Sequence, residues 1–272
     1  MNGPLALSLL LSLLITTSIN SQELNIKIYD EQIGDQEIVV YGDNTELFPV
    51  SIELNLELKG LQTNHHAGDI IVLEANKNKQ ILARLFAKPG KAWSFRTSAK
   101  SSFGNVLVEQ YDTNYIYELP FAAGNEEFIS QGYLGKVSHH DEYALDFNMR
   151  EGTPVLAIRD GLVVKVVDVH NKSCPNPSCM KFNNFITIQH NDGTYADYAH
   201  LKQNSAQVKV GDQVQIGMQI AQSGKTGWTT GPHLHLAVFL PSLNKRKTIP
   251  TLFRISEGKS AYLQAGESYR HP

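Results

Sequence analysis

The chain has 272 residues, a net charge of −3 and an apolar share of 42%. This length allows one large domain or two ordinary ones, and the composition is typical of a globular protein. No cluster of lysine and arginine stands out, so charge argues against a nucleic-acid partner.

The N-terminus carries an uncharged apolar run, Pro4–Ser18, which polar residues follow at once. The run is short for a membrane span, and the pattern is typical of a secretory signal peptide, although no lysine or arginine precedes it. We expect a signal peptide over 1–21, with Ser18 as an alternative cleavage site. No later run is long enough to cross a bilayer. The sequence therefore predicts an exported protein, periplasmic or extracellular, without stable membrane insertion after the signal is removed.

Short strands separated by Gly, Asn, Asp and Pro follow the signal. Ser51–Gly60 alternates polar and apolar residues almost perfectly, as a half-buried antiparallel strand does. Strands at this spacing predict a small β-sandwich-like domain over 22–116. His65 and His66 fall between two of these strands, and nothing nearby completes a metal site, so we interpret them as surface residues.

A second domain is predicted over 117–272, where glycines become denser and histidines cluster. It also consists of strands joined by Gly-containing turns, and no convincing amphipathic helix appears in either domain, so the predicted fold class is all-β. Asp160–Gly161 and Asp192–Gly193 lie between apolar runs, which predicts a β-hairpin at each. His190 ends a strand before the second of these turns, and we interpret it as structural.

The two cysteines, Cys174 and Cys179, flank a segment whose prolines and asparagine favour a turn. A disulfide that closes this tip fits an oxidising compartment. The alternative is half of a cysteine-rich metal site, but no second cysteine pair exists to complete one. A disulfide is the favoured interpretation.

Two histidines, His233 and His235, interrupt the apolar run "TGPHLHLAVFL". On a strand they point to one face, while Leu234, Leu236 and Val238 point to the other. Such a pair can bind one metal, or one ring can bind it while the other does acid–base work. The stretch alone fits a solvated strand face equally well.

Further metal-binding residue types stand upstream. A zinc hydrolase needs three protein ligands, an open position for water, a base and a donor for the oxyanion. The segment "SHHDEYALDF" contains His139, His140 and Asp146, and "DYAHL" contains His200. No HExxH sequence is present, which excludes a thermolysin-type helical site.

These motifs give the chain its resemblance to the lysostaphin-type (LytM-type) zinc endopeptidases. Four segments carry it in the family's order: "GYLGKVSHHDEYALDF", "EGTPVLAIRDGLVVKV", "DGTYADYAHL" and "GDQVQIGMQIAQSGKTGWTTGPHLHLAV". Together they cover nearly all of Tyr117–Leu240. The resemblance implies an antiparallel sheet with an open groove, one Zn²⁺ per chain, and hydrolysis of peptide cross-links in bacterial peptidoglycan.

The resemblance also implies roles for single residues. The metal ligands would be His139, Asp146 and His235. His140 is the alternative to His139, but the family's S-H-x-G spacing favours the histidine that follows Ser138, although Asp141 stands in place of the usual glycine.

His200 and His233 would flank the zinc-bound water, whose pKa the metal lowers toward about 7. As neutral rings they could accept its proton, and as imidazolium they could stabilise the oxyanion or donate to the leaving amine. The sequence does not assign the two steps between them.

Three further residues are predicted to line the substrate groove: Asn184, Tyr198 and Trp228. The N-terminal domain is expected to position the enzyme, gate the groove or bind a regulatory or targeting partner. The alternative function is a non-catalytic member of the fold that binds cell wall or regulates another hydrolase; such members typically lose ligands, and none is missing here. Whether the cross-link is diaminopimelate-type or glycine-rich stays open.

Overall fold

The computed structural model describes residues 24–272, so the predicted signal peptide lies outside the described residues. The chain divides into two compact units, the first ending at Phe103 and the second running from Gly104 to Pro272. The boundary predicted at residue 117 differs because the preceding segment contacts the second unit. Tyr115, for example, lies under the Arg159 guanidinium at 3.8 Å from its ring centre. Within residues 24–272, no helix is long and apolar enough to cross a membrane.

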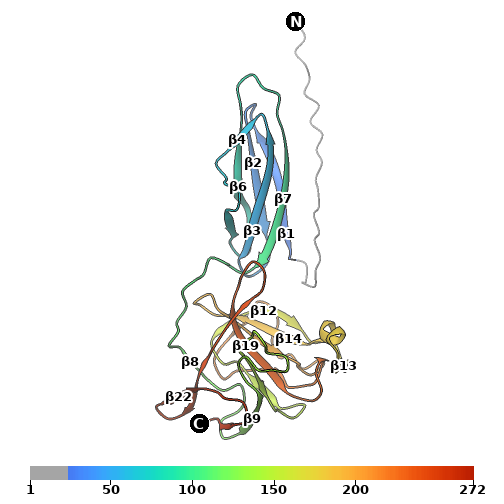
Figure 1. Ribbon diagram of the computed structural model, residues 1–272, viewed down its shortest axis with the longest axis vertical. Coiled ribbons are helices and arrows are strands. Elements are labelled where there is room, and N and C mark those ends of the chain that lie inside the picture. The colour runs from blue at the N-terminus through green and yellow to red at the C-terminus, as the bar shows by residue number, and fades with distance from the viewer. Residues whose placement is uncertain (1–23) are drawn as a thin grey trace. The chain divides into compact units, whose positions relative to one another are not determined.

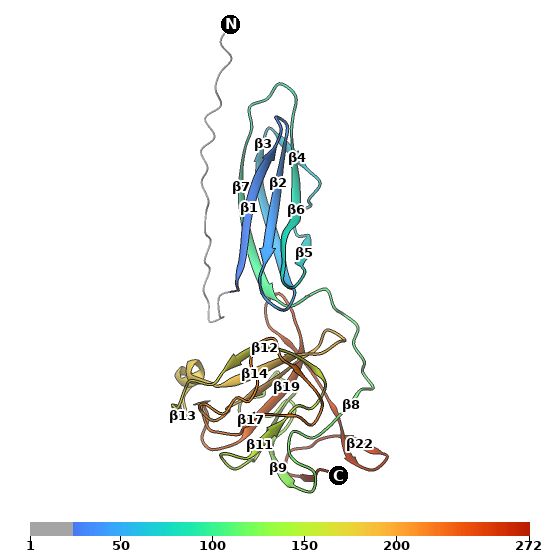
Figure 2. The same ribbon diagram turned by 180° about the vertical axis from the view of Figure 1, so that it is seen from behind.

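The N-terminal unit consists of two antiparallel sheets, coloured blue to green in Figures 1 and 2. One sheet has the strand order β1 (Ile26–Ile33), β2 (Glu37–Asn44), β6 (Lys77–Ala87) and β4 (Leu61–Thr63). The other has the order β5 (Ile70–Leu73), β3 (Val50–Lys59) and β7 (Ser94–Phe103). The alternating segment predicted as a strand forms most of β3, and its residues Ile52 and Leu54 are fully buried.

The second unit is organised around one nine-stranded antiparallel sheet. Its strands run in the order β16 (Gln213–Val214), β12 (Gly161–Val167), β14 (Phe185–Gln189), β15 (Tyr195–Ala199), β19 (Leu234–Leu240), β10 (Ala144–Phe147), β9 (Glu126–Gln131) and β23 (Ser268–Arg270), and β20 (Lys247–Ile249) also pairs with β19. The all-β prediction is confirmed, because the described residues contain a single short 3₁₀ helix, η1 (Pro177–Phe182), beside these strands.

Three small sheets complete this unit. They are the antiparallel pair β11 (Pro154–Leu156) and β17 (Gln219–Gln222), the parallel pair β13 (Ser173–Cys174) and β18 (Gly227–Trp228), and the three-stranded sheet of β22 (Lys259–Tyr262), β21 (Leu252–Ser256) and β8 (Ile116–Tyr117).

One of the two predicted hairpins forms. Asp192–Gly193 joins the antiparallel strands β14 and β15, and Gly193 takes a positive φ of 83° that favours glycine. The prediction for Asp160–Gly161 is wrong, because the flanking strands β11 and β12 belong to different sheets. Gly161 serves close packing instead: a Cβ there would lie 2.4 Å from the carbonyl oxygen of Gln189.

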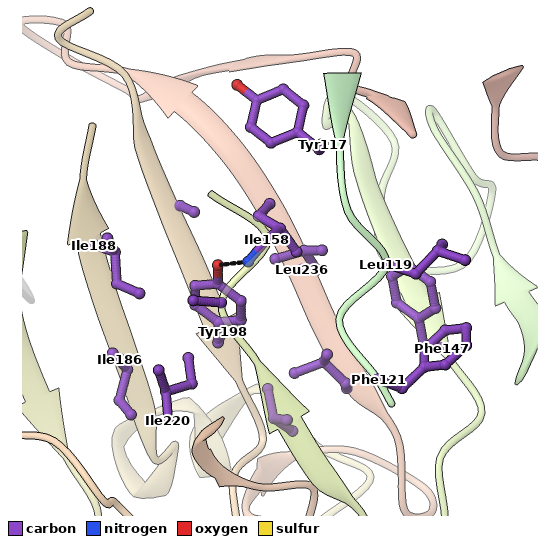
Figure 3. Close-up of a cluster of buried hydrophobic side chains, with 14 of the residues drawn as sticks. Tyr117, Leu119, Phe121, Phe147, Ile158, Ile186, Ile188, Tyr198, Ile220 and Leu236 are labelled. Atoms are coloured by element: carbon purple, nitrogen blue, oxygen red, sulfur yellow. Dashed lines mark hydrogen bonds between the residues drawn. The ribbon is translucent and has the colours of Figure 1, made fainter. Parts of the chain in front are cut away.

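The core of the second unit lies beneath the main sheet, and Figure 3 shows part of it. The Tyr198 hydroxyl accepts a hydrogen bond from the Ile158 amide at 2.9 Å, so even the polar atom of this buried ring has a partner. Leu234, Leu236 and Val238 belong to the same cluster, as predicted for the apolar side of that strand. Burial of these alternate residues anchors β19 and leaves its other side to His235.

His190 is a buried titratable group, as its structural interpretation requires. It is 2% exposed, its Nδ1 lies 2.9 Å from Thr194 Oγ1, and its Nε2 has no hydrogen-bond partner among the described residues. Burial, helped by the nearby Arg159 guanidinium, lowers the pKa of His190 to about 3. The folded protein therefore keeps this ring neutral far below the ordinary histidine range.

We expect this ring to make the protein sensitive to acid. Below pH 6.5 the unfolded chain binds a proton at His190 that the folded chain does not, so stability present at neutral pH falls as the pH drops toward 3. Between pH 7 and pH 5 the loss amounts to about 2 kcal/mol. Urea unfolding at both pH values should show a smaller loss for His190→Gln than for the wild type. His66→Gln, at an exposed histidine, is the control, and equal losses in all three proteins would contradict the prediction.

Candidate metal centre

Strand register brings two of the predicted metal ligands together. Asp146 on β10 lies directly opposite His235 on β19, and Ala199 on β15 lies opposite His235 on the other side. Residues opposite each other on antiparallel strands project to the same face. Asp146 and His235 therefore meet across one row of the sheet, and His200 follows directly after Ala199. His139 reaches the same place from the loop between β9 and β10.

The three side chains converge on one point. His139 Nε2 lies 3.3 Å from Asp146 Oδ1, His235 Nδ1 lies 3.0 Å from the same oxygen, and the two nitrogens are 3.2 Å apart. A tetrahedral zinc ion with bonds of about 2.0–2.1 Å holds its ligand atoms about 3.3 Å from one another. The triangle formed by the three atoms therefore fits a zinc ion with one position left open.

The tautomer of His139 suits a ligand. Its Nδ1 lies 3.1 Å from the carbonyl oxygen of Gly132, which can only accept, so this nitrogen carries the hydrogen. The lone pair of Nε2 then points at the Asp146 carboxylate, where two acceptors face each other unless a cation lies between them. A histidine whose second ring nitrogen donates to a carbonyl is the usual arrangement of a zinc ligand.

The electrostatics of the cluster also favour a cation. Burial opposes ionisation of Asp146, but His139 and His235, in their protonated forms that donate to it, outweigh this effect and hold the pKa of this carboxyl far below its usual range. Burial likewise opposes a charge on His139, but the Asp146 carboxylate outweighs it and raises the pKa of that ring. The carboxylate is thus ionised at neutral pH and draws positive charge into the site.

His200 lies beside this triangle in an unusual backbone conformation. Its φ is 61°, in the left-handed region that few non-glycine residues adopt. Its amide donates to Asn183 Oδ1 at 3.0 Å, and its Nδ1 donates to the carbonyl oxygen of Thr226 at 2.7 Å. Burial, followed by the neighbouring His233 and His235, lowers the pKa of His200 to about 3, so the ring is neutral at pH 7 with the lone pair on Nε2.

His233 is held in the same tautomer by its own neighbours. Its Nδ1 lies 3.0 Å from the carbonyl oxygen of Gly231, and Thr229 Oγ1 lies 3.2 Å away. Its Nε2 lies 3.8 Å from Asp146 Oδ1. The rings of His233 and His200 have their centres 4.6 Å apart. The two rings therefore lie together beside the candidate metal site, each with its Nδ1 against a backbone carbonyl oxygen.

The predicted disulfide is confirmed: Cys174 and Cys179 are bonded, with their Cα atoms 5.9 Å apart. It closes a tip in which Asn176 caps η1 by accepting from the Ser178 amide. Next to this tip, β13 pairs with β18. The Gly227 amide donates to the carbonyl oxygen of Lys172 at 2.9 Å.

This tip is linked to both flanking histidines. The Thr229 amide donates to the carbonyl oxygen of Cys174 at 3.3 Å, and Thr229 also contacts His233. Thr226, just before β18, holds the His200 ring. Neither threonine was predicted as a support of the site, although both lie in the last of the four segments quoted for the resemblance.

The remaining predicted site residues lie in different environments. His140 is exposed, and His139 takes the place in the cluster. Trp228 is half-buried on β18. The groove prediction for Tyr198 needs correction, because this ring is 0% exposed and belongs to the core under the sheet.

Asn184 also needs correction as a groove residue, because it is 0% exposed. Its side chain joins three backbone groups: Oδ1 accepts from the His170 amide, and Nδ2 donates to the carbonyl oxygens of His170 and Leu201. The residue is a buried link between chain segments and does not face a substrate.

Part of this unit matches a known protein family. Residues 140–248 match the family described as peptidase family M23, and the matched range begins one residue after His139. Residues 140–248 are an M23 peptidase domain. The resemblance to the lysostaphin-type peptidases is thereby confirmed.

Several relatives of this M23 domain carry informative names. The chain is 33% identical over 141 residues to the glycyl-glycine endopeptidase ALE-1 of Staphylococcus capitis, which covers 52% of this chain and 32% of that protein. It is 39% identical over 90 residues to the peptidoglycan DD-endopeptidase ShyA of Vibrio cholerae, which covers 33% and 18% respectively. The chain thus spans a third or less of the length of these curated relatives.

Among solved structures, the catalytic domain of lysostaphin from Staphylococcus simulans is 30% identical to this chain. The match covers 46% of this chain and 87% of that one, with a TM-score of 0.34.

Loss of the disulfide should destabilise the second unit. A short closed loop of this size contributes about 2 kcal/mol by restricting the unfolded chain. We expect the double variant Cys174→Ser/Cys179→Ser to show a lower unfolding midpoint than the wild type under oxidising conditions, and the same midpoint once the wild type is reduced. An unchanged midpoint for the double variant in oxidising buffer would show that the disulfide adds no stability.

Proposed function

We propose that this protein is a zinc-dependent endopeptidase that hydrolyses peptide cross-links of bacterial peptidoglycan. The observation that carries the proposal is the convergence of His139, Asp146 and His235 within 3.3 Å of one another, with His200 and His233 beside them. Family membership supports a peptidase, and the names of ALE-1 and ShyA support a cell-wall substrate.

Three atoms of the chain would hold the metal: His139 Nε2, Asp146 Oδ1 and His235 Nδ1. Bound zinc would supply Lewis acidity and lower the pKa of a coordinated water toward about 7. The protein's contribution is to aim these atoms before the metal arrives. The Gly132 carbonyl fixes the His139 ring, and strand pairing fixes Asp146 against His235.

His200 and His233 would handle the proton. Each donates its Nδ1 hydrogen to a backbone carbonyl, so each has its Nε2 left to take up a proton. A ring that takes the proton from water becomes an imidazolium, which can stabilise the oxyanion of the tetrahedral intermediate or donate to the leaving amine. Because the carbonyls prevent the rings from turning over, little reorganisation is needed during the reaction.

We also propose export of the chain to the periplasm or the cell exterior after removal of a signal peptide over 1–21. The disulfide supports an oxidising compartment. The N-terminal unit would then position the peptidase, gate its groove or bind a targeting partner.

Replacement of a metal ligand should abolish both zinc binding and cleavage. We expect His235→Ala to lose stoichiometric zinc and more than about 100-fold of its activity, since the loss of a supporting residue alone costs 10–100-fold. Zinc content and the release of new amino termini from peptidoglycan provide the measurements. His139→Ala should behave likewise, and His140→Ala, one residue away and exposed, is the matched control.

The same experiment tests the alternative function and the substrate. Zinc binding without cleavage of either a diaminopimelate-type or a glycine-bridged peptidoglycan would favour a non-catalytic cell-wall-binding member of the fold. If the wild type binds no stoichiometric zinc and cleaves neither substrate, the proposal is wrong. Cleavage of one substrate identifies the bond.

Variants of the flanking histidines should separate chemistry from metal binding. His200→Gln and His233→Gln remove a proton acceptor and leave all three ligand atoms in place. We expect each to keep about one zinc per chain and to lose about 10²–10⁴-fold in turnover. Parallel measurements of zinc content and kcat would reveal a ligand role instead if zinc were lost together with activity.

A further inference from the structure

One side chain contacts the candidate metal centre without belonging to any motif described above. Gln131 is the last residue of β9 and lies opposite Asp146 on β10. Together with His235 opposite Asp146 on the other side, it continues a single row across the sheet. Its Nε2 donates to Asp146 Oδ2 at 3.0 Å. We infer that Gln131 is a positioning residue of the metal centre, which holds one oxygen of Asp146 so that the other faces the metal.

The orientation of the Gln131 amide is forced by its surroundings. Its Oε1 accepts from the amides of Val137 and Ser138 at 3.1 and 3.0 Å, and only an oxygen can accept from two N–H groups. The NH₂ group must therefore face the other way, where it donates to Asp146 Oδ2 and to Ser138 Oγ at 2.7 Å. Both hydrogens and both lone pairs of the amide are used.

Because of these contacts, the two oxygens of the Asp146 carboxylate have different partners. Oδ1 faces the histidines, with His139 Nε2 at 3.3 Å and His235 Nδ1 at 3.0 Å, whereas Oδ2 faces Gln131. A carboxylate fixed in this way offers a metal one oxygen and cannot rotate to offer both. In the described part of the chain, Gln131 is the one donor other than a histidine that contacts this carboxylate side chain.

The same amide also fixes the approach of a second ligand. Val137 and Ser138 directly precede His139, so the two backbone hydrogen bonds to Gln131 set the position at which the chain enters the site. One side chain therefore couples the Asp146 carboxylate to the loop that carries His139. Gln131 forms direct hydrogen bonds both with the carboxylate and with the loop.

The chemistry of the amide suits this task. A lysine or arginine at position 131 could also donate to Oδ2, but its charge would neutralise the carboxylate and repel a metal ion. A neutral donor orients the carboxylate and leaves its negative charge available. Outer residues that orient metal ligands are typically worth 10–100-fold in metal affinity.

The inference rests on the proposed zinc site, and its test uses the full chain. We expect Gln131→Met, which keeps the side-chain length but cannot donate, to weaken zinc binding 10–100-fold in competition with a chelator. The matched control is Gln203→Met. The Gln203 side chain donates to the carbonyl oxygen of Val169 at 2.8 Å in the same unit, so its loss should leave zinc affinity within about 3-fold of the wild type.

A second variant distinguishes the loss of the hydrogen bond to Asp146 from unfolding of the protein. Gln131→Glu keeps an acceptor for the Val137 and Ser138 amides, so the loop retains its contacts, but the ionised side chain cannot donate to Asp146. At a pH where both carboxylates are ionised they repel each other, so the Asp146 carboxylate must rotate away. We expect an altered visible absorption spectrum when Co²⁺ replaces zinc, with the thermal midpoint of the metal-free protein close to that of the wild type.

The outcomes separate the two proposals. Wild-type zinc affinity in Gln131→Met together with a wild-type cobalt spectrum in Gln131→Glu would overturn the positioning role and leave the proposed function standing. Failure of the wild-type protein to bind zinc would overturn the proposed function and this inference with it. Weaker zinc binding in Gln131→Met beside normal binding in Gln203→Met would support the positioning role.

Discussion

The antiparallel pairing of β10 with β19 is the constraint on which the site depends. It sets Asp146 opposite His235 and thereby creates a carboxylate and an imidazole on one face of the sheet. Both strands are held from the other side by the core, where Leu236 and its neighbours are buried. A slip of one residue would turn His235 toward that core and Leu236 toward the solvent. The hydrophobic pattern of β19 therefore fixes the strand register that keeps His235 opposite Asp146.

Backbone carbonyl groups determine which nitrogen of each histidine is available. Gly132, Thr226 and Gly231 each accept from an Nδ1, and so three rings present Nε2 to the centre. His235 differs, because its Nδ1 faces the carboxylate. The fold thus sets the orientation of each ring through its strand pairing and its backbone contacts.

The sequence predicts the candidate ligands of this centre, but it does not predict the groups that hold those ligands in place. Histidines and an aspartate in a fixed order are rare enough to be informative, and the structure brings the three predicted ligands together. The carbonyl of Thr226 could not be predicted, because every residue has one. Gln131 was missed for a related reason: its role comes from strand register and from a loop, neither of which leaves a local pattern. Asn184 was wrongly predicted to line the groove, because a polar side chain can also be buried when it forms hydrogen bonds with backbone groups inside the protein.

The left-handed backbone at His200 has a consequence for any attempt to stabilise this protein. A non-glycine residue in that region costs about 1–2 kcal/mol, so glycine would suit the backbone better than histidine does. Under the proposed mechanism, however, glycine would remove a proton acceptor. Selection of variants for heat resistance alone would therefore favour proteins that lack this proton acceptor at position 200, and a selection that also demands turnover is needed to keep the histidine.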